Sequence, residues 1–388
     1  MHQSRPPQSS QEFAQLGLSQ LRSGDVQSAR RNLEISIQKG FTHPDVWVAL
    51  GQACFRLNDS DNAIKAYDTA LKQAPQHMRA LLAKGEALQA AGKLRDAITF
   101  YKGALKVAPP PEQVPADIRP SFMKAFELIE KQNKLYENAL TSHLPSTDAI
   151  QKTSPRFANS IDILLGRSKP YFQQPTRYHF PELPQRAVFK RDEFDWVADI
   201  ESKTDAIRNE LLAILQNQQN LSPYVQAKES DIVLRDNTLV NNPDWSACYL
   251  WKNGELQEEM AAQCPVTVEA LSKIPMDFLP KQTPSALFSV LKPGTHIPPH
   301  HGMINTRLIC HLPLIVPDGC GFRVGNHELQ WRVGELLIFD DSIEHEAWNK
   351  GSETRVVLLF EIWRPELTSA ERDLITQTFT AISRHDEV

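Results

Sequence analysis

A repeat of 34 residues in the first third of the chain constrains its fold most strongly. Six positions recur at this interval: Trp47, Gly51, Ala63, Tyr67, Ala70 and Pro75 align with Leu81, Gly85, Ala97, Tyr101, Ala104 and Pro109. A weaker third copy lies upstream, with Phe13, Gly17 and Ala29 one interval before Trp47, Gly51 and Ala63. A repeat of this length is one pair of helices, which buries its apolar face only by stacking on the next pair. We therefore expect residues 10–140 to form an array of helical hairpins.

The interval of 34 residues is that of the tetratricopeptide repeat. Gly51 and Ala63 are expected where the two helices of one repeat cross closely, and Pro75 should close the second helix. The pattern fades after Pro109, and we interpret residues 118–140 as one more helix pair that caps the array. Two roles remain open for the array: it binds a peptide or protein partner, or it only supports the next domain.

The second part of the chain has the pattern of a β-domain. Residues 141–179 are expected to be a linker with one short apolar helix at 157–165. From residue 180 to residue 388 we expect one amphipathic helix at about 195–215, then mainly strands, and a last helix that ends near residue 383. The strand candidates are short apolar runs between turn residues, at 286–291, 306–314, 321–324, 335–339 and 355–363. Strands at this spacing indicate a sandwich or barrel.

Composition restricts the class of protein. Of the 388 residues, 41% are hydrophobic and 23% charged, which is typical of globular proteins. The formal charge of −5 provides no positive field for nucleic acid. Residues 1–12 lack the apolar core of a secretory signal, and no run of about 20 apolar residues could span a membrane. The five cysteines form no CxxC pair. We therefore expect a cytoplasmic protein with reduced cysteines and with neither a nucleic-acid nor a membrane partner.

Histidines concentrate in the strand-rich region. Six of the twelve lie between residues 296 and 345, where an even distribution would place about 1.5: His296, His300, His301, His311, His327 and His345. Neutral imidazole is the common protein ligand of iron, copper and zinc, so the cluster predicts a metal site. The count identifies neither the metal nor the binding subset, because several of these histidines could simply hydrogen-bond turns and loops.

Three long motifs follow one another through the same region: SVLKPGTHIPPHHG at 289–302, NTRLICHLPL at 305–314, and FDDSIEHEAWN at 339–349 followed by Arg355. Together with FPELP at 180–184 and WSACYLWKNG at 245–254, they resemble the aspartyl/asparaginyl β-hydroxylases. The resemblance covers residues 180–372. It implies a double-stranded β-helix of the jelly-roll or cupin type at residues 180–388, and a dioxygenase that uses iron(II) and 2-oxoglutarate.

The resemblance also implies a metal centre and a co-substrate site. His300 and His345 would be the catalytic pair that binds the iron. Gly302 stands where most related oxygenases carry a third, acidic ligand, and the family is similar in lacking that acid. Arg355 and Ser289 would bind the distal carboxylate of 2-oxoglutarate, because a planar guanidinium meets a carboxylate in two parallel hydrogen bonds.

Three further residues have implied roles that stay open. Arg307 and His311 would also contact the co-substrate, and Trp245 would lie near the substrate. His311 and Trp245 would equally suit a plain hydrophobic core. Ile309 replaces an arginine that the family commonly has. Since residues 307, 309 and 311 share one face of a strand, Arg307 could partly compensate, with weaker co-substrate affinity or a different substrate as the expected consequence.

Three functions are consistent with these observations. The first is hydroxylation of Asp, Asn or another residue of a protein or peptide that the repeats could engage. The second is a catalytically reduced β-helix domain in a tetratricopeptide-mediated binding or sensory protein, which Ile309 favours. The third is a cupin-type isomerase or zinc hydrolase, which would need His296 or His301 as a third ligand. The presence of all four residues of the implied metal and co-substrate sites favours the first: His300, His345, Ser289 and Arg355.

Overall fold

The computed structural model describes residues 8–216, 221–227 and 239–385. The chain divides into two compact units, residues 1–158 and 159–388. Nothing in this division tests the domain limits expected at residues 140 and 180, which stay predictions. Within the described residues, no helix is both long enough and apolar enough to cross a bilayer.

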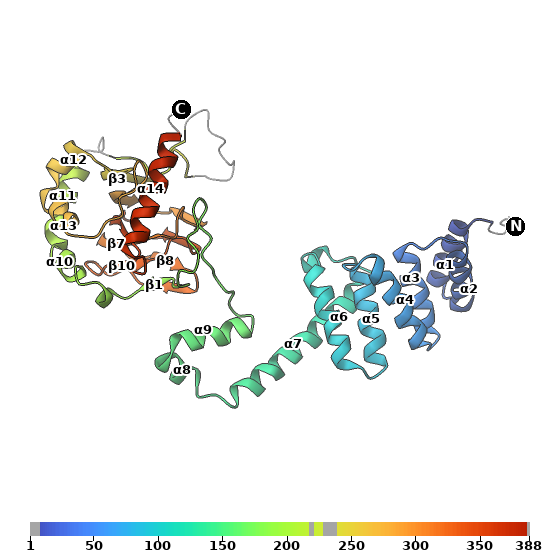
Figure 1. Ribbon diagram of the computed structural model, residues 1–388. Coiled ribbons are helices and arrows are strands. Elements are labelled where there is room, and N and C mark those ends of the chain that lie inside the picture. Colours follow the sequence, from blue (N-terminus) through green and yellow to red (C-terminus); the bar gives the residue numbers. More distant parts are fainter. Residues whose placement is uncertain (1–7, 217–220, 228–238, 386–388) are drawn as a thin grey trace. The chain divides into compact units, whose positions relative to one another are not determined.

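The first unit is the predicted array of helical hairpins (Figure 1). Its three pairs are α1 (Ser10–Ser23) with α2 (Val26–Gln38), α3 (Pro44–Arg56) with α4 (Ser60–Gln73), and α5 (Met78–Ala90) with α6 (Leu94–Val107). Gly51 and Gly85 face the rings of Tyr67 and Tyr101 on the partner helix so closely that a β-carbon at either glycine would collide with the ring. The repeated glycines therefore set the crossing distance within each pair, as predicted.

The segment after the repeats departs from the prediction. Residues 118–140 do not form a helix pair, because α7 (Arg119–Thr141) runs through them as one helix of 23 residues. This helix contains no glycine, and its only proline, Pro120, lies in the first turn, where a backbone N–H has no partner within the helix. Nothing therefore interrupts the helical hydrogen bonds. The 3-10 turn η1 (Pro111–Gln113) precedes α7, and two short helices follow it, α8 (Thr147–Thr153) and α9 (Pro155–Leu164).

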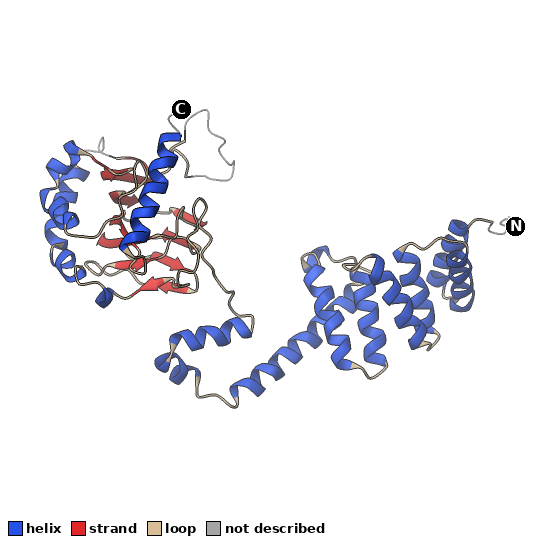
Figure 2. Ribbon diagram, in the orientation of Figure 1, coloured by secondary structure: helices blue, strands red, loops and turns tan. Residues whose placement is uncertain are grey.

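The second unit contains two antiparallel sheets (Figure 2). The larger sheet has the order β1-β10-β7-β12-β5-β3-β2, with β4 paired to β3, and the smaller has the order β6-β11-β8-β9. The strands are β1 (Val188–Phe189), β2 (Ser222–Pro223), β3 (Trp245–Lys252), β4 (Glu255–Leu256), β5 (Ala286–Leu291), β6 (His296–His300), β7 (Arg307–Ile315), β8 (Cys320–Val324), β9 (His327–Leu329), β10 (Leu337–Phe339), β11 (His345–Asn349) and β12 (Arg355–Trp363). From β5 to β12 the chain crosses repeatedly between the sheets, which is the predicted double-stranded β-helix.

Side chains of the larger sheet alternate between two buried faces. Even-numbered residues such as Phe288, Cys310 and Leu358 pack against the helices of this unit. Odd-numbered residues such as Leu287 and Leu359 point between the two sheets. The covering helices are α10 (Val197–Ser202), α11 (Thr204–Leu215), α12 (Glu258–Gln263) and α13 (Pro265–Ser272), which lie together along one side of the strands (Figure 1). The 3-10 turn η2 (Arg191–Glu193) precedes them.

The helix expected at 195–215 is broken into α10 and α11 at Lys203. Two flanking hydroxyls account for the break: Ser202 Oγ donates to Asp199 O at 2.6 Å, and Thr204 Oγ1 donates to Glu201 O at 2.6 Å. Such side-chain bonds compete with the helical ones. The expected last helix is α14 (Ser369–His385), and its residues Ile375 and Phe379 are buried in a separate apolar cluster.

Candidate active site

Two histidines face each other across one pair of strands. His300 ends β6, His345 begins β11, and the two residues are direct partners in the strand register. Their ring centroids are 4.1 Å apart. His300 Nδ1 lies 2.8 Å from Pro298 O, and His345 Nδ1 lies 3.0 Å from Ile343 O. A carbonyl oxygen can only accept, so Nδ1 of each ring carries the proton and Nε2 keeps its lone pair.

Both rings are neutral at ordinary pH. Burial lowers the pKa of His345 to about 3, and the nearby His300 lowers it further in the same direction. Burial also lowers the pKa of His300. A metal ion binds the neutral imidazole, so this pair presents two nitrogen donors without first losing protons.

A carboxylate occupies the space beside Gly302, the second residue after His300. A β-carbon at Gly302 would collide with the carboxylate of Asp341, which lies in the turn before β11. Burial raises the pKa of Asp341 to about 6, against the opposing effect of Arg307. A side-chain ligand at position 302 is therefore sterically excluded. No group of three or more His, Cys, Asp or Glu side chains suited to a metal ion occurs in the described part of the chain.

A buried arginine is placed beside Ser289 and Trp245. Arg355 is 2% exposed, and its Nη2 lies 3.5 Å from Ser289 Oγ, which also accepts a 3.2 Å hydrogen bond from Trp245 Nε1. Among the described residues, Arg355 Nε has no hydrogen-bond partner. Burial lowers the pKa of Arg355 to about 10. A buried cation without a carboxylate partner is costly, so this corner of the fold is suited to an anionic ligand.

His311 belongs to an aromatic cluster next to this arginine. Its ring stacks on Trp331 at a centroid distance of 5.7 Å and meets the edge of Phe339 at 5.0 Å. Burial lowers the pKa of His311 well below its ordinary value, and the positive charge of Arg355 lowers it further. His311 Nδ1 is buried and has no hydrogen-bond partner within the described residues. The ring is therefore neutral and has one polar atom available to a ligand.

Arg307 is held between two acidic side chains. Its Nη1 donates to Glu361 Oε1 at 2.5 Å and its Nη2 to Asp341 Oδ2 at 3.3 Å. Burial lowers the pKa of Arg307, but the carboxylates of Glu361 and Asp341 oppose this effect and the net shift is upward. Arg307 therefore carries a permanent charge that neighbouring side chains already neutralise.

All seven site residues that the sequence suggested line one cavity of about 310 Å³: Trp245, Ser289, His300, Arg307, His311, His345 and Arg355. Ligand pockets span roughly 300–1,000 Å³, so this one is small. Ile309 also lines the cavity and is 6% exposed. His301 also lines the cavity, whereas His296 does not: it is 52% exposed and bonds Glu346 at 2.8 Å. His327 is the first residue of β9 and does not line the cavity.

Sequence reasoning missed three residues of this cavity. Tyr224 stacks on Trp245 with a centroid distance of 4.1 Å, and no sequence signal announces it. Asp341, the second acidic residue of the FDDSIEHEAWN motif, lies in the turn before β11 and also lines the cavity. Glu361 lies six residues after Arg355 on β12, so strand alternation alone could have placed it on the same face.

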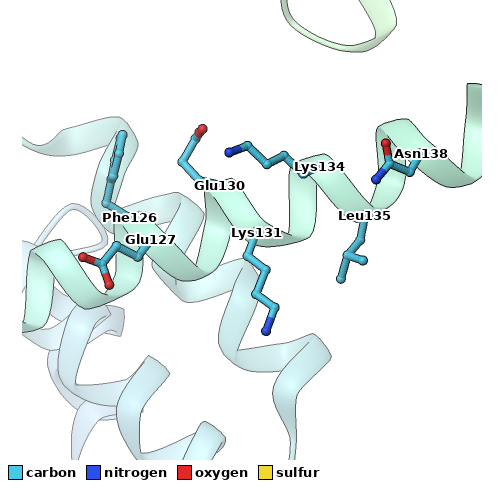
Figure 3. A pocket seen from close by; sticks show the side chains of 7 residues that line it. All are labelled: Phe126, Glu127, Glu130, Lys131, Lys134, Leu135 and Asn138. Carbon is cyan, nitrogen blue, oxygen red and sulfur yellow. The ribbon is translucent and has the colours of Figure 1, made fainter.

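The first unit has two further hollows. The larger, of about 760 Å³, is lined by α1, α3, α4, α5 and the start of α7, and includes the ion pair of Arg79 with Asp117. The other lies on α7 alone, where one helix face presents an alternation of charged and apolar side chains (Figure 3). Its residues are Phe126, Glu127, Glu130, Lys131, Lys134, Leu135 and Asn138. Among the described residues, no histidine lines either hollow, whereas the cavity of the second unit contains two neutral histidines and a buried arginine without a carboxylate partner.

Fold and site define a two-part protein, a helical-repeat array joined to a jelly-roll domain that encloses a cavity with two neutral histidines and a buried arginine. Residues 201–365 match the aspartyl/asparaginyl beta-hydroxylase family, and residues 15–75 and 55–113 match the tetratricopeptide repeat. The chain thus carries an aspartyl/asparaginyl β-hydroxylase domain that follows tetratricopeptide repeats, as the sequence motifs indicated.

Two curated relatives of this segment are named as hydroxylases. The ornithine lipid ester-linked acyl 2-hydroxylase of Rhizobium tropici is 37% identical over 189 residues, which cover 48% of this chain and 63% of that protein. The human aspartyl/asparaginyl beta-hydroxylase is 34% identical over 177 residues, which cover 45% of this chain and 22% of that protein. The matched segment thus spans less than two thirds of either relative.

Solved structures resemble the chain only distantly. The Yersinia enterocolitica type III secretion chaperone SycD, in complex with a peptide of the translocator YopD, is 16% identical with a TM-score of 0.29, and the match covers 33% of this chain and 93% of that chain.

Proposed function

We propose that this protein is a dioxygenase that uses iron(II) and 2-oxoglutarate to hydroxylate a carbon atom of its substrate. The observation that carries the proposal is the meeting of two kinds of group in one cavity. A pair of neutral histidines with free Nε2 atoms and a buried arginine without a carboxylate partner both line it.

The residues of the cavity fit both groups. Two imidazoles suit a divalent iron and leave coordination positions open for a chelating co-substrate and for dioxygen. Arg355 Nε and His311 Nδ1 are buried polar atoms that lack partners among the described residues, and a carboxylate could satisfy them. Ser289 lies next to Arg355, in the position expected of a second donor to the same carboxylate.

Each group of side chains would have a separate task. Iron(II) with 2-oxoglutarate supplies a reaction in which one oxygen atom of dioxygen enters succinate, with loss of carbon dioxide, and the other enters a substrate C–H bond. His300 and His345 would hold the metal, and Arg355 with Ser289 would bind and orient the distal carboxylate. Phe322 and Phe339, which are almost fully buried, would keep water out of the cavity.

The acceptor and the partner belong to the proposal as well. The sequence resemblance implies an Asp or Asn residue of a protein or peptide, and the names of the relatives include both such a residue and a lipid acyl chain. The hollow of about 760 Å³ in the repeat array would engage a protein or peptide partner. The protein would work in the cytoplasm. The alternative of a catalytically reduced binding module is supported only by Ile309.

An anaerobic titration tests the metal and the co-substrate without a known acceptor. Metal-free protein is titrated with iron(II) and 2-oxoglutarate, and the visible charge-transfer band of the chelated complex is recorded. We expect a band in the wild type and none in His345→Ala. His296→Ala is the matched control, because that ring lies outside the cavity, and it should keep the band. A folded wild-type protein without a band would refute the proposal and favour the binding module.

A further inference from the structure

Two loops carry the histidine pair. The loop of residues 301–306 follows His300 at the end of β6, and the loop of residues 340–344 precedes His345 at the start of β11. The two imidazoles can serve one metal ion only while both loops keep their relative position. The contacts that hold these loops therefore decide how well the histidine pair is formed.

Residues 173–178, which we call the strap, run along both loops. Gln174 N donates to Ser342 O at 2.7 Å in the loop before β11. Two residues further along, Thr176 N donates to Gly302 O at 3.0 Å in the loop after β6. One continuous segment is thus hydrogen-bonded through its backbone to the loop beside each histidine.

The side chain of Gln173 joins the two loops directly. Its Nε2 donates to Asp340 Oδ2 at 2.7 Å, and its Oε1 accepts from Asn305 Nδ2 at 3.0 Å. Gln173 is 7% exposed, and both partners are 0% exposed. An amide has a donor end and an acceptor end, so this one side chain can bond a carboxylate in one loop and an N–H in the other. Loss of the amide would leave buried polar atoms with fewer partners, which is unfavourable.

The strap also supports the carbonyl group that orients His345. Ile343 O lies 3.0 Å from His345 Nδ1, and Ile343 forms an isolated antiparallel bridge with Gln173. The hydrogen bond to the second nitrogen of a metal-binding imidazole fixes the orientation of the ring, and its loss typically costs roughly 10–100-fold in metal affinity. A displaced strap should therefore reach the histidine through this carbonyl.

We propose that Gln173 is a positioning residue of the metal site, and that the strap is a working part of that site as well as a connection between domains. The strap precedes residues 201–365, which match the hydroxylase family, and it falls within the linker expected at residues 141–179. The inference rests on the proposed function, because it assigns His300 and His345 to the metal. It goes further in naming the segment that holds the two histidines together.

A titration of the metal-free full chain with cobalt(II) tests the inference without co-substrate or dioxygen. The visible d–d absorption of cobalt(II) reports the geometry of its ligands, and the titration gives the dissociation constant. We expect Gln173→Ala to bind cobalt(II) about tenfold more weakly than the wild type and to shift the absorption bands. Gln174→Ala is the matched control, because it removes the same side chain at the next, exposed position, and it should change neither quantity.

A second control separates positioning from a general loss of stability. Ile207 is 0% exposed and packs in the apolar core between the helices and the larger sheet. Ile207→Val removes one buried methyl group and should lower the Tm without changing the cobalt(II) affinity or spectrum. All titrations are made well below the Tm of every variant. If Ile207→Val weakens cobalt(II) binding as much as Gln173→Ala does, the effect is a general one and the positioning role is wrong.

An exchange of amide and carboxylate tests the bond between Gln173 and Asp340, and it serves also if Gln173→Ala does not fold. Gln173→Glu keeps the shape of the side chain but places a second carboxylate against Asp340, so the cobalt(II) affinity should fall. Adding Asp340→Asn restores a donor, an acceptor and a single negative charge beside Arg364, and should recover part of the affinity. A double variant that binds no better than Gln173→Glu would overturn the role of this bond.

The outcomes separate the two proposals. A wild-type protein that binds no cobalt(II), or binding that His345→Ala does not abolish, removes the metal site of the proposed function and this inference with it. Normal binding by the wild type, with the same affinity and spectrum in a folded Gln173→Ala variant, overturns only the inference.

Discussion

The turn that precedes β11 depends on a fully buried ion pair. Arg364 and Asp340 are both 0% exposed, and Arg364 Nη1 lies 2.5 Å from Asp340 Oδ2. The same oxygen accepts from Gln173 Nε2 at 2.7 Å, and Asp340 Oδ1 accepts from Ser342 N at 3.0 Å. Asp340 therefore holds the turn that presents Asp341 and His345 to the cavity.

Arg364→Met should destabilise the second unit strongly, because it leaves the Asp340 carboxylate buried without a counter-ion. Loss of one partner of a buried pair costs about 3–5 kcal/mol. For a unit of this size, each kcal/mol changes Tm by roughly 2–4 °C, so Tm should fall by about 6–20 °C. Tryptophan fluorescence is a suitable probe of thermal unfolding, since six of the seven tryptophans lie after residue 158.

Two further variants sharpen this prediction. Arg332→Met removes a partner of Glu335 at 3.4 Å, but Arg332 is 65% exposed, so only a small decrease in Tm is expected. Adding Asp340→Asn to Arg364→Met removes the orphaned charge and should restore part of the lost stability. The reasoning is refuted if Arg364→Met lowers Tm no more than Arg332→Met does.

Three other predictions concern packing, pH dependence and co-substrate affinity. Gly85→Ala should lower the unfolding free energy of the repeat array, measured in urea, by about 1–3 kcal/mol, because the new β-carbon collides with the Tyr101 ring. Gly103→Ala is the control: its β-carbon would lie 3.6 Å from the nearest atom, on Leu81, so the change should be neutral or stabilising. Burial, reinforced by Glu361, raises the pKa of Asp277 well above its ordinary value, so the folded state holds a proton that the unfolded state releases. The unfolding free energy should therefore fall as pH rises above about 4, and Asp277→Asn should flatten that profile in urea titrations at several pH values. The centroid of the Trp331 ring lies 5.3 Å from the Arg355 guanidinium, so Trp331→Leu removes a ring that helps to position this arginine. The variant should bind 2-oxoglutarate roughly two- to thirtyfold more weakly in the absorbance titration. An unchanged affinity would contradict the positioning role of Trp331.

Patterns that are local in sequence predicted much of the fold. The repeats and the strands β5 and β12 were predicted well because their own residues determine them. Both strands are buried on both faces and read as continuous apolar runs. By contrast, β6 contains Pro298 and Pro299, which are unfavourable in a strand, and β11 begins with His345 and Glu346. These two strands are defined by pairing with each other, which a local pattern does not reveal.

The candidate site, too, was predictable from the sequence only in part. The motifs led to His300, His345 and Arg355, and the structure brings all three to one cavity. The neutralisation of Arg307 could not be read from the sequence, because it depends on Glu361, which lies 54 residues further along the chain. The sequence left open that Arg307 partly compensates for Ile309, but its pairing with Glu361 and Asp341 leaves it less free to do so.

The two prolines of β6 affect how the protein behaves in a crowded solution. β6 is an edge strand, and exposed edge strands can recruit strands of other chains. Neighbouring residues of a strand direct their N–H groups to opposite edges, so one of the two prolines removes a donor that an incoming strand would need. At the opposite edge β9 has only three residues. The sheet that carries both histidines is thereby protected from intermolecular pairing and aggregation at its two borders.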